Sequence, residues 1–272
     1  MKKNKETRDY RLFLELLHDT YIRTPNPWQR DWLIHKELRE VAWDLEYFHG
    51  LAPRLVPGKR RVSADLERPE HAEIVYEGGQ LRIGDQTVME DWQTKLMRRL
   101  AEIVTRGHGD VLEVGFGLGL SATAIQEFGA RSHTIVECNA AIVDRFTSWR
   151  SDHAAARIHL LEGRWEDCVH RLGEYDGILF DIYPLTKAEM LKAILQDVTL
   201  AQPFFDVAAR HLAPGGVFTY FTGELDSLSR QHQRLLLQRF SSVTISVIDG
   251  LSPQEDSQIW WAPTMAIVEA RK

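Results

Sequence analysis

The chain has 272 residues, of which 44% are hydrophobic and 26% charged, a composition typical of a globular protein with one large domain, or one domain and an appendage. Its net charge of −6 argues against general binding to nucleic-acid phosphates, which requires clustered cations. The two cysteines fit no disulfide or metal-ligand pattern, and no run reaches the ~20 apolar residues of a membrane span. We therefore expect a cytoplasmic protein with no signal peptide, no metal site, and no nucleic-acid or membrane partner.

Residues 9–50 predict two amphipathic helices rich in aromatic side chains, because apolar residues recur at steps of three and four on either side of Thr24-Pro25-Asn26-Pro27. Residues 51–70 contain prolines and a short basic run, and predict a linker or an extended arm. We expect residues 1–70 to form a helical appendage. It either packs on the rest of the chain, forms a homodimer through residues 9–50, or covers an active site. Residues 71–272 are expected to form the second domain.

The second domain begins with short elements. Val75-Tyr76 and residues 81–83, separated by Gly78-Gly79, predict a small hairpin. Residues 88–105 predict a helix that leads directly into the first strand of a larger sheet.

The central motif is a glycine loop. Residues 111–114 predict a strand, Gly115, Gly117 and Gly119 follow at steps of two, and residues 120–128 predict a helix. Glycines there allow a sharp turn and leave room for a ligand against the backbone, which the helix N-terminus faces. Glu113 beside the loop would repel a pyrophosphate, and it suits a ligand that carries positive charge, such as S-adenosylmethionine. Another nucleotide and a purely structural turn remain alternatives, because glycine spacing alone is a weak signal.

Two acidic residues at predicted strand ends strengthen the nucleoside interpretation. Glu137 ends the second strand, where a carboxylate can accept hydrogen bonds from ribose hydroxyls. Asp181 ends the fourth strand, near the switch in strand order where ligands bind in such sheets. A solvated glutamate and a turn-forming aspartate are the simpler interpretations of each residue alone.

The rest of the chain alternates strands and helices, which predicts an α/β, Rossmann-like fold with a mainly parallel seven-stranded sheet and an antiparallel last hairpin. The candidate helices are 120–128, 140–151, 166–171, 188–211 and 224–239. The candidate strands are 111–114, 133–137, 157–161, 176–181, 216–221, 243–248 and 264–269.

Five sequence motifs, which follow one another along roughly residues 85–272, resemble those of the guanidinoacetate N-methyltransferase family, which includes arginine δ-N-methyltransferases. They are Val88-Met89-Glu90-Asp91-Trp92, Val111-Leu112-Glu113-Val114-Gly115-Phe116-Gly117, Val136-Glu137-Cys138-Asn139, Gly163-Arg164-Trp165-Glu166-Asp167 and Asp176-Gly177-Ile178-Leu179-Phe180-Asp181-Ile182-Tyr183-Pro184-Leu185. The resemblance implies a class I methyltransferase that uses S-adenosylmethionine.

The resemblance also implies roles for individual residues. Asp181 would bind the guanidino group of the acceptor and take its proton, and Glu90 is a second candidate catalytic carboxylate. The residues implied to hold the cofactor are Met89, Met97, Glu113, Gly115, Phe116, Gly117, Leu118, Gly119, Leu120, Glu137, Cys138, Asn139, Trp165, Glu166 and Asp181. The residues implied to contact the acceptor are Trp92, Gln93, Asp181, Tyr183, Thr222, Gly223 and Glu224.

The chain departs from the family at two points. Gln93 stands where the family has a second acceptor-site glutamate, and glutamine cannot neutralise a guanidinium. Glu224 stands in the region where guanidinoacetate enzymes hold the acceptor's carboxylate, which it would repel if it faced inward. Alternatively, Glu224 begins the following helix. Both departures favour arginine or an arginine-derived metabolite over guanidinoacetate.

We therefore expect an N-methyltransferase of a small guanidino metabolite. Two other acceptors remain open: a non-guanidinium nitrogen of a secondary metabolite, and the δ-nitrogen of protein arginine. A cofactor-binding partner protein without activity is the alternative of another class.

Overall fold

The computed structural model describes residues 69–84, 86–184, 186, 189, 197–254, 257, 259–260 and 262–272, which all lie in one unit that spans residues 54–272. The predicted helices and homodimer contact within residues 9–50 lie outside the described residues, so the domain boundary at residue 70 stays a prediction. In the described part of the chain, no helix is long and apolar enough to cross a bilayer, and no three His, Cys, Asp or Glu side chains are grouped to hold a metal ion.

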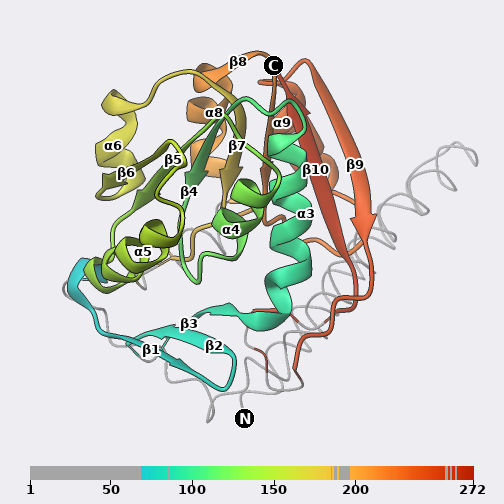
Figure 1. Cartoon of the computed structure of the whole chain (residues 1–272). Coiled ribbons are helices and arrows are strands. Elements are labelled where there is room, and N and C mark those ends of the chain that lie inside the picture. The colour runs from blue at the N-terminus through green and yellow to red at the C-terminus, as the bar shows by residue number, and fades with distance from the viewer. Residues whose placement is uncertain are drawn as a thin grey trace, which may run out of the picture. The chain divides into compact units, whose positions relative to one another are not determined.

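The fold is built on a seven-stranded sheet with the order β6-β5-β4-β7-β8-β10-β9 (Figure 1). β10 runs opposite to the other six strands and pairs antiparallel with β8 and β9, so the predicted parallel sheet with an antiparallel last hairpin is confirmed. The strands are β4 (Asp110–Val114), β5 (Ser132–Glu137), β6 (Ile158–Glu162), β7 (Tyr175–Phe180), β8 (Leu212–Tyr220), β9 (Ser242–Ile248) and β10 (Met265–Arg271).

Helices cover both faces of this sheet, because its central strands are buried on both sides. Helices α3 (Thr94–Thr105), α4 (Leu120–Glu127) and α5 (Ala140–Asp152) lie on one face, in front of the sheet in Figure 1. Helices α8 (Phe205–His211) and α9 (Arg230–Leu237) cover the other face. The short α6 (Trp165–Cys168) follows β6.

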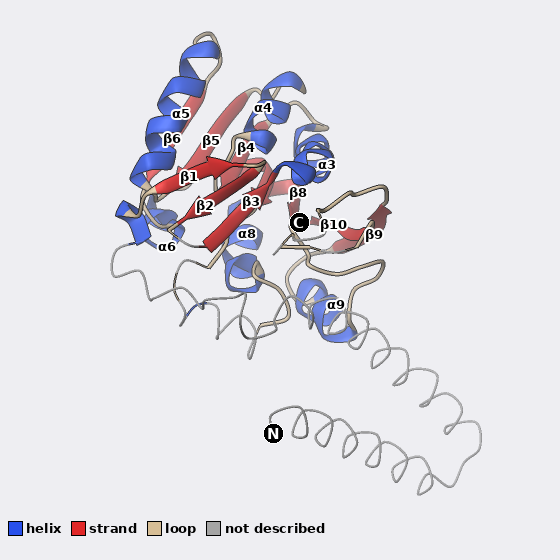
Figure 2. Cartoon of the chain, turned by 90° about the horizontal axis from the view of Figure 1, so that it is seen from below, coloured by secondary structure: helices blue, strands red, loops and turns tan. Residues whose placement is uncertain are grey.

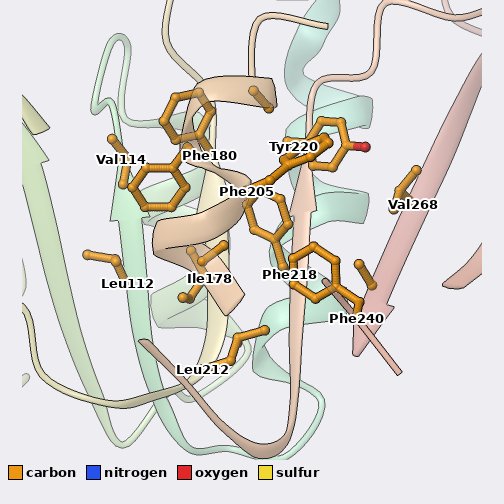
Figure 3. Packing of buried hydrophobic residues seen from close by; sticks show 14 of the residues in the cluster. Leu112, Val114, Ile178, Phe180, Phe205, Leu212, Phe218, Tyr220, Phe240 and Val268 are labelled. Carbon is orange, nitrogen blue, oxygen red and sulfur yellow. The ribbon is translucent and has the colours of Figure 1, made fainter. Parts of the chain in front are cut away.

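The larger core cluster lies on the α8 side of the sheet (Figure 3). Leu112 and Val114 of β4 point into it together with Ile178 and Phe180 of β7, and Phe205 of α8 packs against them. Successive side chains of a strand alternate between faces. The residue between the first two, Glu113, therefore points to the opposite face, under α4.

A second, three-stranded antiparallel sheet precedes α3. It consists of β1 (Ile74–Glu77), β2 (Gln80–Ile83) and β3 (Gln86–Glu90). In Figures 1 and 2 this sheet lies across the carboxyl ends of the main strands. The prediction of a helix from residue 88 was wrong, because residues 86–90 alternate in burial and pair with β2. A 3₁₀ turn at Asp91–Gln93 then leads into α3.

Two further predicted helices need correction. Of the predicted helix 188–211, residue 189 is helical, residues 197–201 are not, and a 3₁₀ turn at Gln202–Phe204 leads into α8. The predicted helix 224–239 begins only at Arg230, because the hydroxyl of Ser229 accepts a hydrogen bond from the backbone N–H of His232 and caps it there. Glu224 therefore lies in the preceding loop.

Candidate active site

The glycine loop makes the predicted sharp turn at the carboxyl end of β4. Gly115, Gly117 and Gly119 have φ angles of 97°, 53° and 77°, which other residues rarely adopt. At Gly115 an added Cβ would lie 2.1 Å from the carbonyl oxygen of Asp181, and at Gly117 it would lie 2.8 Å from the sulfur of Met89. The loop therefore passes closely between the end of β7 and the small sheet. Leu120 opens α4, whose first-turn amides have no partner within the helix.

The small sheet is tied to three loops that follow main-sheet strands. The N–H of Leu118 donates to the sulfur of Met89 at 3.3 Å, after β4. The side chain of Asn139 donates to the carbonyl of Ala72 at 3.0 Å, after β5. After β7, the carbonyl of Pro184 accepts from Gln86 at 2.9 Å. The small sheet thus covers the edge at which ligands of such sheets bind.

The two methionines predicted beside the cofactor differ in position. Met89 belongs to β3 and lies over the glycine loop. Met97 is completely buried within α3. Met97 therefore packs inside the protein in this structure, whereas Met89 lies against the backbone of the glycine loop.

Three backbone amides orient the carboxylate of Glu137. One oxygen accepts from the N–H groups of Cys138 at 2.7 Å and Asn139 at 2.9 Å, and the other accepts from Phe116 at 3.0 Å. A carboxylate has about four lone-pair sites, so the second oxygen keeps one for a further donor. This geometry fits the predicted hydrogen bond to a ribose hydroxyl.

Cys138 and Asn139, which follow Glu137, stabilise the loop and provide no reactive group. Asn139 is fully buried and caps α5, because its Oδ1 accepts from the N–H groups of Ala141 and Ile142 at 3.0 and 3.1 Å. Burial raises the pKa of the Cys138 thiol to about 12, and the charge of Glu137 adds to the effect. The thiol therefore stays protonated and unreactive at neutral pH.

Glu113 lies under α4, fully buried, and not on the surface of the loop. The hydroxyl of Ser121 donates to one of its oxygens. Nε2 of His133 lies 2.9 Å from the other oxygen, in a close contact that lacks hydrogen-bond alignment. Glu113 therefore contributes a buried negative charge beneath the site.

Asp181 follows β7, and its N–H donates to the carbonyl of Val114 at 2.9 Å. Its side chain is partly exposed, and within the described residues no lysine or arginine forms an ion pair with it. Desolvation raises the pKa of Asp181 to about 7, and the negative charge of Glu113 contributes to this rise. Among the described residues, no positive charge close to Asp181 favours its ionised form.

Glu90, at the end of β3, is buried and already holds several donors. Its Oε2 accepts from the indole N–H of Trp92 at 2.6 Å and from the hydroxyl of Ser257, and its Oε1 accepts from Gln80 at 3.1 Å. The side-chain oxygen of Gln93 accepts from the N–H of Glu90 at 2.8 Å. These contacts fix the side chain of Glu90, and they hold the indole N–H of Trp92 and the side chain of Gln93 beside it.

After β6, Trp165 packs edge-on against Phe180 and Phe204, with ring centroids 6.2 and 5.2 Å apart. It stays partly exposed, whereas Glu166 is exposed. Arg164, to which the sequence assigned no role, lies between carboxylates of three segments. It contacts Glu189, and its nitrogens lie 3.8 Å from Glu70 and 3.7 Å from Glu166.

The loop after β8 carries the main finding that the sequence missed. Glu224 is buried, with one oxygen 2.8 Å from Nδ1 of His232 and the other accepting from the N–H of Ser229 at 3.0 Å. Nε2 of His232 lies 2.5 Å from the hydroxyl of Tyr220. No short motif could have revealed this chain of contacts, because the start of α9 sets the position of His232.

The remaining acceptor candidates lie nearby in the chain. Thr222 is buried and donates to the carbonyl of Ala266 at 2.7 Å, and Gly223 has a φ of 68°. Tyr183 is partly exposed just beyond Asp181.

An aromatic contact links this segment to the small sheet. The ring of Phe221 contacts that of Trp260, with centroids 6.3 Å apart, and the N–H of Trp260 donates to Ser257, which holds Glu90. The loop after β8 is thereby connected to the end of β3.

Comparison with known proteins places this site in a family. A family model described as guanidinoacetate N-methyltransferase matches residues 67–244. Protein arginine N-methyltransferase 2 of Candida glabrata is 31% identical over 143 residues, which cover 50% of this chain and 32% of that protein. The Kluyveromyces lactis protein of the same name is 30% identical over 169 residues, which cover 60% and 38%. The chain thus spans about a third of the length of the curated relatives it matches.

Among solved structures, spermidine synthase of Thermotoga maritima superposes with a TM-score of 0.51 at 12% sequence identity, covering 79% of this chain and 83% of that one. At this identity the likeness shows the shared fold alone.

Proposed function

Because the chain belongs to the guanidinoacetate N-methyltransferase family of S-adenosylmethionine-dependent methyltransferases, we propose that it transfers a methyl group to a nitrogen of a small guanidino metabolite. Arginine or an arginine-derived compound is the preferred acceptor over guanidinoacetate. The observation that carries this proposal is Asp181, a carboxylate without a cationic partner among the described residues, at the end of β7 beside the glycine loop.

The residues present fit the cofactor that the family implies. The three glycines let the turn pack closely against Asp181, Met89 and Phe116 at the carboxyl end of β4, Glu137 keeps an acceptor site for a ribose hydroxyl, and Met89 and Trp165 offer apolar surface. When bound, S-adenosylmethionine supplies an electrophilic methyl group on a sulfonium and leaves as S-adenosylhomocysteine. The buried charge of Glu113 favours a cation at this place.

Asp181 has two tasks in this proposal. A guanidinium has a pKa above ~12, so the acceptor enters protonated and must lose one proton as its nitrogen gains the methyl group. The carboxylate of Asp181 accepts hydrogen bonds from the planar guanidinium, which orients the nitrogen, and then accepts the departing proton. Orientation of this kind can contribute ~7–11 kcal/mol to catalysis.

Of the two departures from the family pattern, Glu224 bears on the choice of acceptor, whereas Gln93 bears on the local turn. Gln93 accepts a backbone hydrogen bond from Glu90, a contact that a glutamate could also make, so the substitution preserves the local turn. Glu224 holds a negative charge after β8, where the family binds the acceptor's carboxylate. That charge favours an acceptor with an amino or other cationic group.

A protein arginine is the second candidate acceptor, favoured by the relatives named protein arginine N-methyltransferase 2. The chain covers only about a third of those proteins, so residues beyond the similar part would have to supply recognition of a protein substrate here.

The test measures S-adenosylhomocysteine release and a one-methyl mass gain with guanidinoacetate, free arginine, agmatine and an arginine-containing peptide. We expect turnover of arginine or agmatine, its loss in Asp181→Asn, and retained cofactor binding by calorimetry. Asp176→Asn, an isosteric change at the other end of β7, is the matched control and should stay active. Turnover of the peptide alone would select the second candidate. Cofactor binding without turnover of any acceptor would contradict the guanidino proposal.

A further inference from the structure

Strand β9 is an edge of the seven-stranded sheet and pairs only with β10 among the described residues. Figure 1 shows it at the outer margin of the sheet. An edge strand presents a row of backbone N–H and C=O groups that another strand can pair with, so natural proteins guard such edges with charges, prolines or bulges.

β9 carries none of these guards. Its seven residues, Ser-Val-Thr-Ile-Ser-Val-Ile, include no charge, proline or glycine, and the pairing with β10 runs without a bulge. Ile245 and Val247 point to the same face and are 38% and 47% exposed. The opposite edge, β6, differs: its exposed side chains are His159 and Glu162. The open edge is thus confined to one side of the sheet.

The sequence of β9 is close to a palindrome about Ile245. If two copies pair antiparallel about this residue, Ile245 faces Ile245, Val243 faces Val247, and Thr244 faces Ser246. Ser242 and Ile248 form the one unlike pair at the ends. β-branched and hydroxyl cross-strand pairs each contribute roughly 0.2–1 kcal/mol. An unrelated extended peptide would match this pattern only by chance, whereas a second copy matches it by symmetry.

The charged side chains at the two ends of β9 form ion pairs within their own chain. Asp249, which follows the strand, lies near Lys95, Arg239 before the strand pairs with Asp206, and Arg271 of β10 pairs with Glu269. The case for a second copy therefore comes from the strand sequence and not from charges at its ends.

We infer that β9 is a homodimer contact, in which two copies pair antiparallel about Ile245 and join two seven-stranded sheets into one. This contact has two-fold symmetry, so it closes on itself and does not propagate into a filament. A seven-residue strand pair is small for a permanent interface, and we expect a concentration-dependent dimer with a dissociation constant of about 1–50 μM.

The first test is sedimentation equilibrium of the full chain across this concentration range. Val247→Lys should abolish the dimer, because two lysines per interface then lie at the paired edge. Val75→Lys is the matched control: Val75 is an exposed valine, at 40%, on β1, which is the edge strand of the small sheet, and its replacement should leave the dimer intact. Circular dichroism checks that both variants fold.

The second test fixes the register. Ile245→Cys should form a disulfide with itself under mild oxidation, because directly opposite residues lie ~4.5–5.5 Å apart between Cα atoms. Val243→Cys and Val247→Cys should each form no disulfide alone, and the two variants should cross-link with each other when they are mixed. Mass spectrometry of the linked peptides distinguishes these disulfides from any that involve Cys138 or Cys168.

A chain that stays monomeric at about 100 μM would overturn the proposal. So would a dimer that Val247→Lys leaves unchanged, since that dimer would use another surface, or cross-linking without the predicted register. These outcomes do not depend on methyltransferase activity.

Discussion

Nδ1 of His232 lies 2.8 Å from a carboxylate oxygen of Glu224, although eight residues and a helix start separate them in the chain. A carboxylate only accepts, so Nδ1 carries the proton and Nε2 faces the hydroxyl of Tyr220 at 2.5 Å. Burial raises the pKa of Tyr220 well above its usual range, so this phenol stays protonated and can donate. The hydrogen bonds from β8 to α9 thus hold the loop in which Glu224 lies.

His232→Ala should destabilise the protein by about 2–4 kcal/mol, because it removes the hydrogen bond that Nδ1 of His232 donates to a buried carboxylate. His232→Gln keeps an N–H donor for Glu224, so its loss of stability should be distinctly smaller than that of His232→Ala. Denaturant unfolding measures both. If the loop binds the acceptor, KM for the acceptor should rise in His232→Gln more than kcat falls. Equal losses of stability in the two variants would show that the hydrogen bond to Glu224 contributes nothing.

Asp181 should make stability depend on pH. Its pKa is about 7 in the folded chain against 3.8 for an ordinary aspartate, so folding favours the protonated form. The stabilisation is therefore complete below pH ~4 and is lost as the pH rises through ~7. Asp181→Asn removes this loss and should be more stable than the parent by about 1–3 kcal/mol at pH 8, a range discounted for the partial exposure of the side chain.

The measurement is the unfolding free energy of the parent and of Asp181→Asn from pH 4 to 8. The difference should be smallest at the acid end, where Asp181 is protonated in the folded chain and about half protonated in the unfolded chain. Glu113→Gln provides an independent check, since removal of this charge should lower the pKa of Asp181 and shift the stability curve to lower pH. A stability difference between the parent and Asp181→Asn that does not vary with pH would contradict the assignment.

Position 115 should tolerate no side chain, whereas position 78 should tolerate a small one. Both have positive φ, 97° and 59°, so alanine strains the backbone at either site. At Gly78 a Cβ meets nothing within 4 Å, and we expect a loss of about 1 kcal/mol. At Gly115 the Cβ would clash with the carbonyl of Asp181, so Gly115→Ala should cost at least about 3 kcal/mol or displace the loop.

Thermal unfolding and S-adenosylhomocysteine binding distinguish these effects. Gly78→Ala should bind as the parent does, and Gly115→Ala should not bind measurably. Similar stability and binding of the two variants would mean that backbone strain, rather than the close approach to Asp181, limits the loop.

The part of the site on the main sheet could be predicted because each piece is local. A buried strand ends at Gly115, another at Glu137 and another at Asp181, and parallel strands bring their carboxyl ends to one edge. The family resemblance then supplied roles that these patterns alone do not give.

The parts that could not be predicted depend on tertiary contacts. The run from Val88 to Glu90 is too short for its periodicity to separate strand from helix, and pairing with β2 decides it. The pairs Glu113–His133 and Glu224–His232 join different elements, so the spacing of these residues in the sequence does not predict their contacts. Glu113 also shows that a carboxylate beside a glycine loop in sequence can point under the helix, since strand side chains alternate between faces.

Gln93→Glu tests how this chain tolerates the residue that its family resemblance implies at this position. A glutamate there can still accept the hydrogen bond from the N–H of Glu90, but it adds a second buried carboxylate beside Glu90. Like charges close together in a buried site disfavour ionisation, so one of the two should bind a proton at neutral pH. We expect Gln93→Glu to lose about 1–3 kcal/mol of stability at pH 8 and little at pH 5.

A bound guanidinium would neutralise the added charge, so arginine should restore part of the stability of Gln93→Glu at pH 8 in thermal unfolding. Gln80→Glu is the matched control, because Gln80 also contacts Glu90 but belongs to β2, and arginine should not rescue it. Rescue of both variants would indicate a general ionic effect. Rescue of Gln93→Glu alone would show that a guanidino group binds beside residue 93.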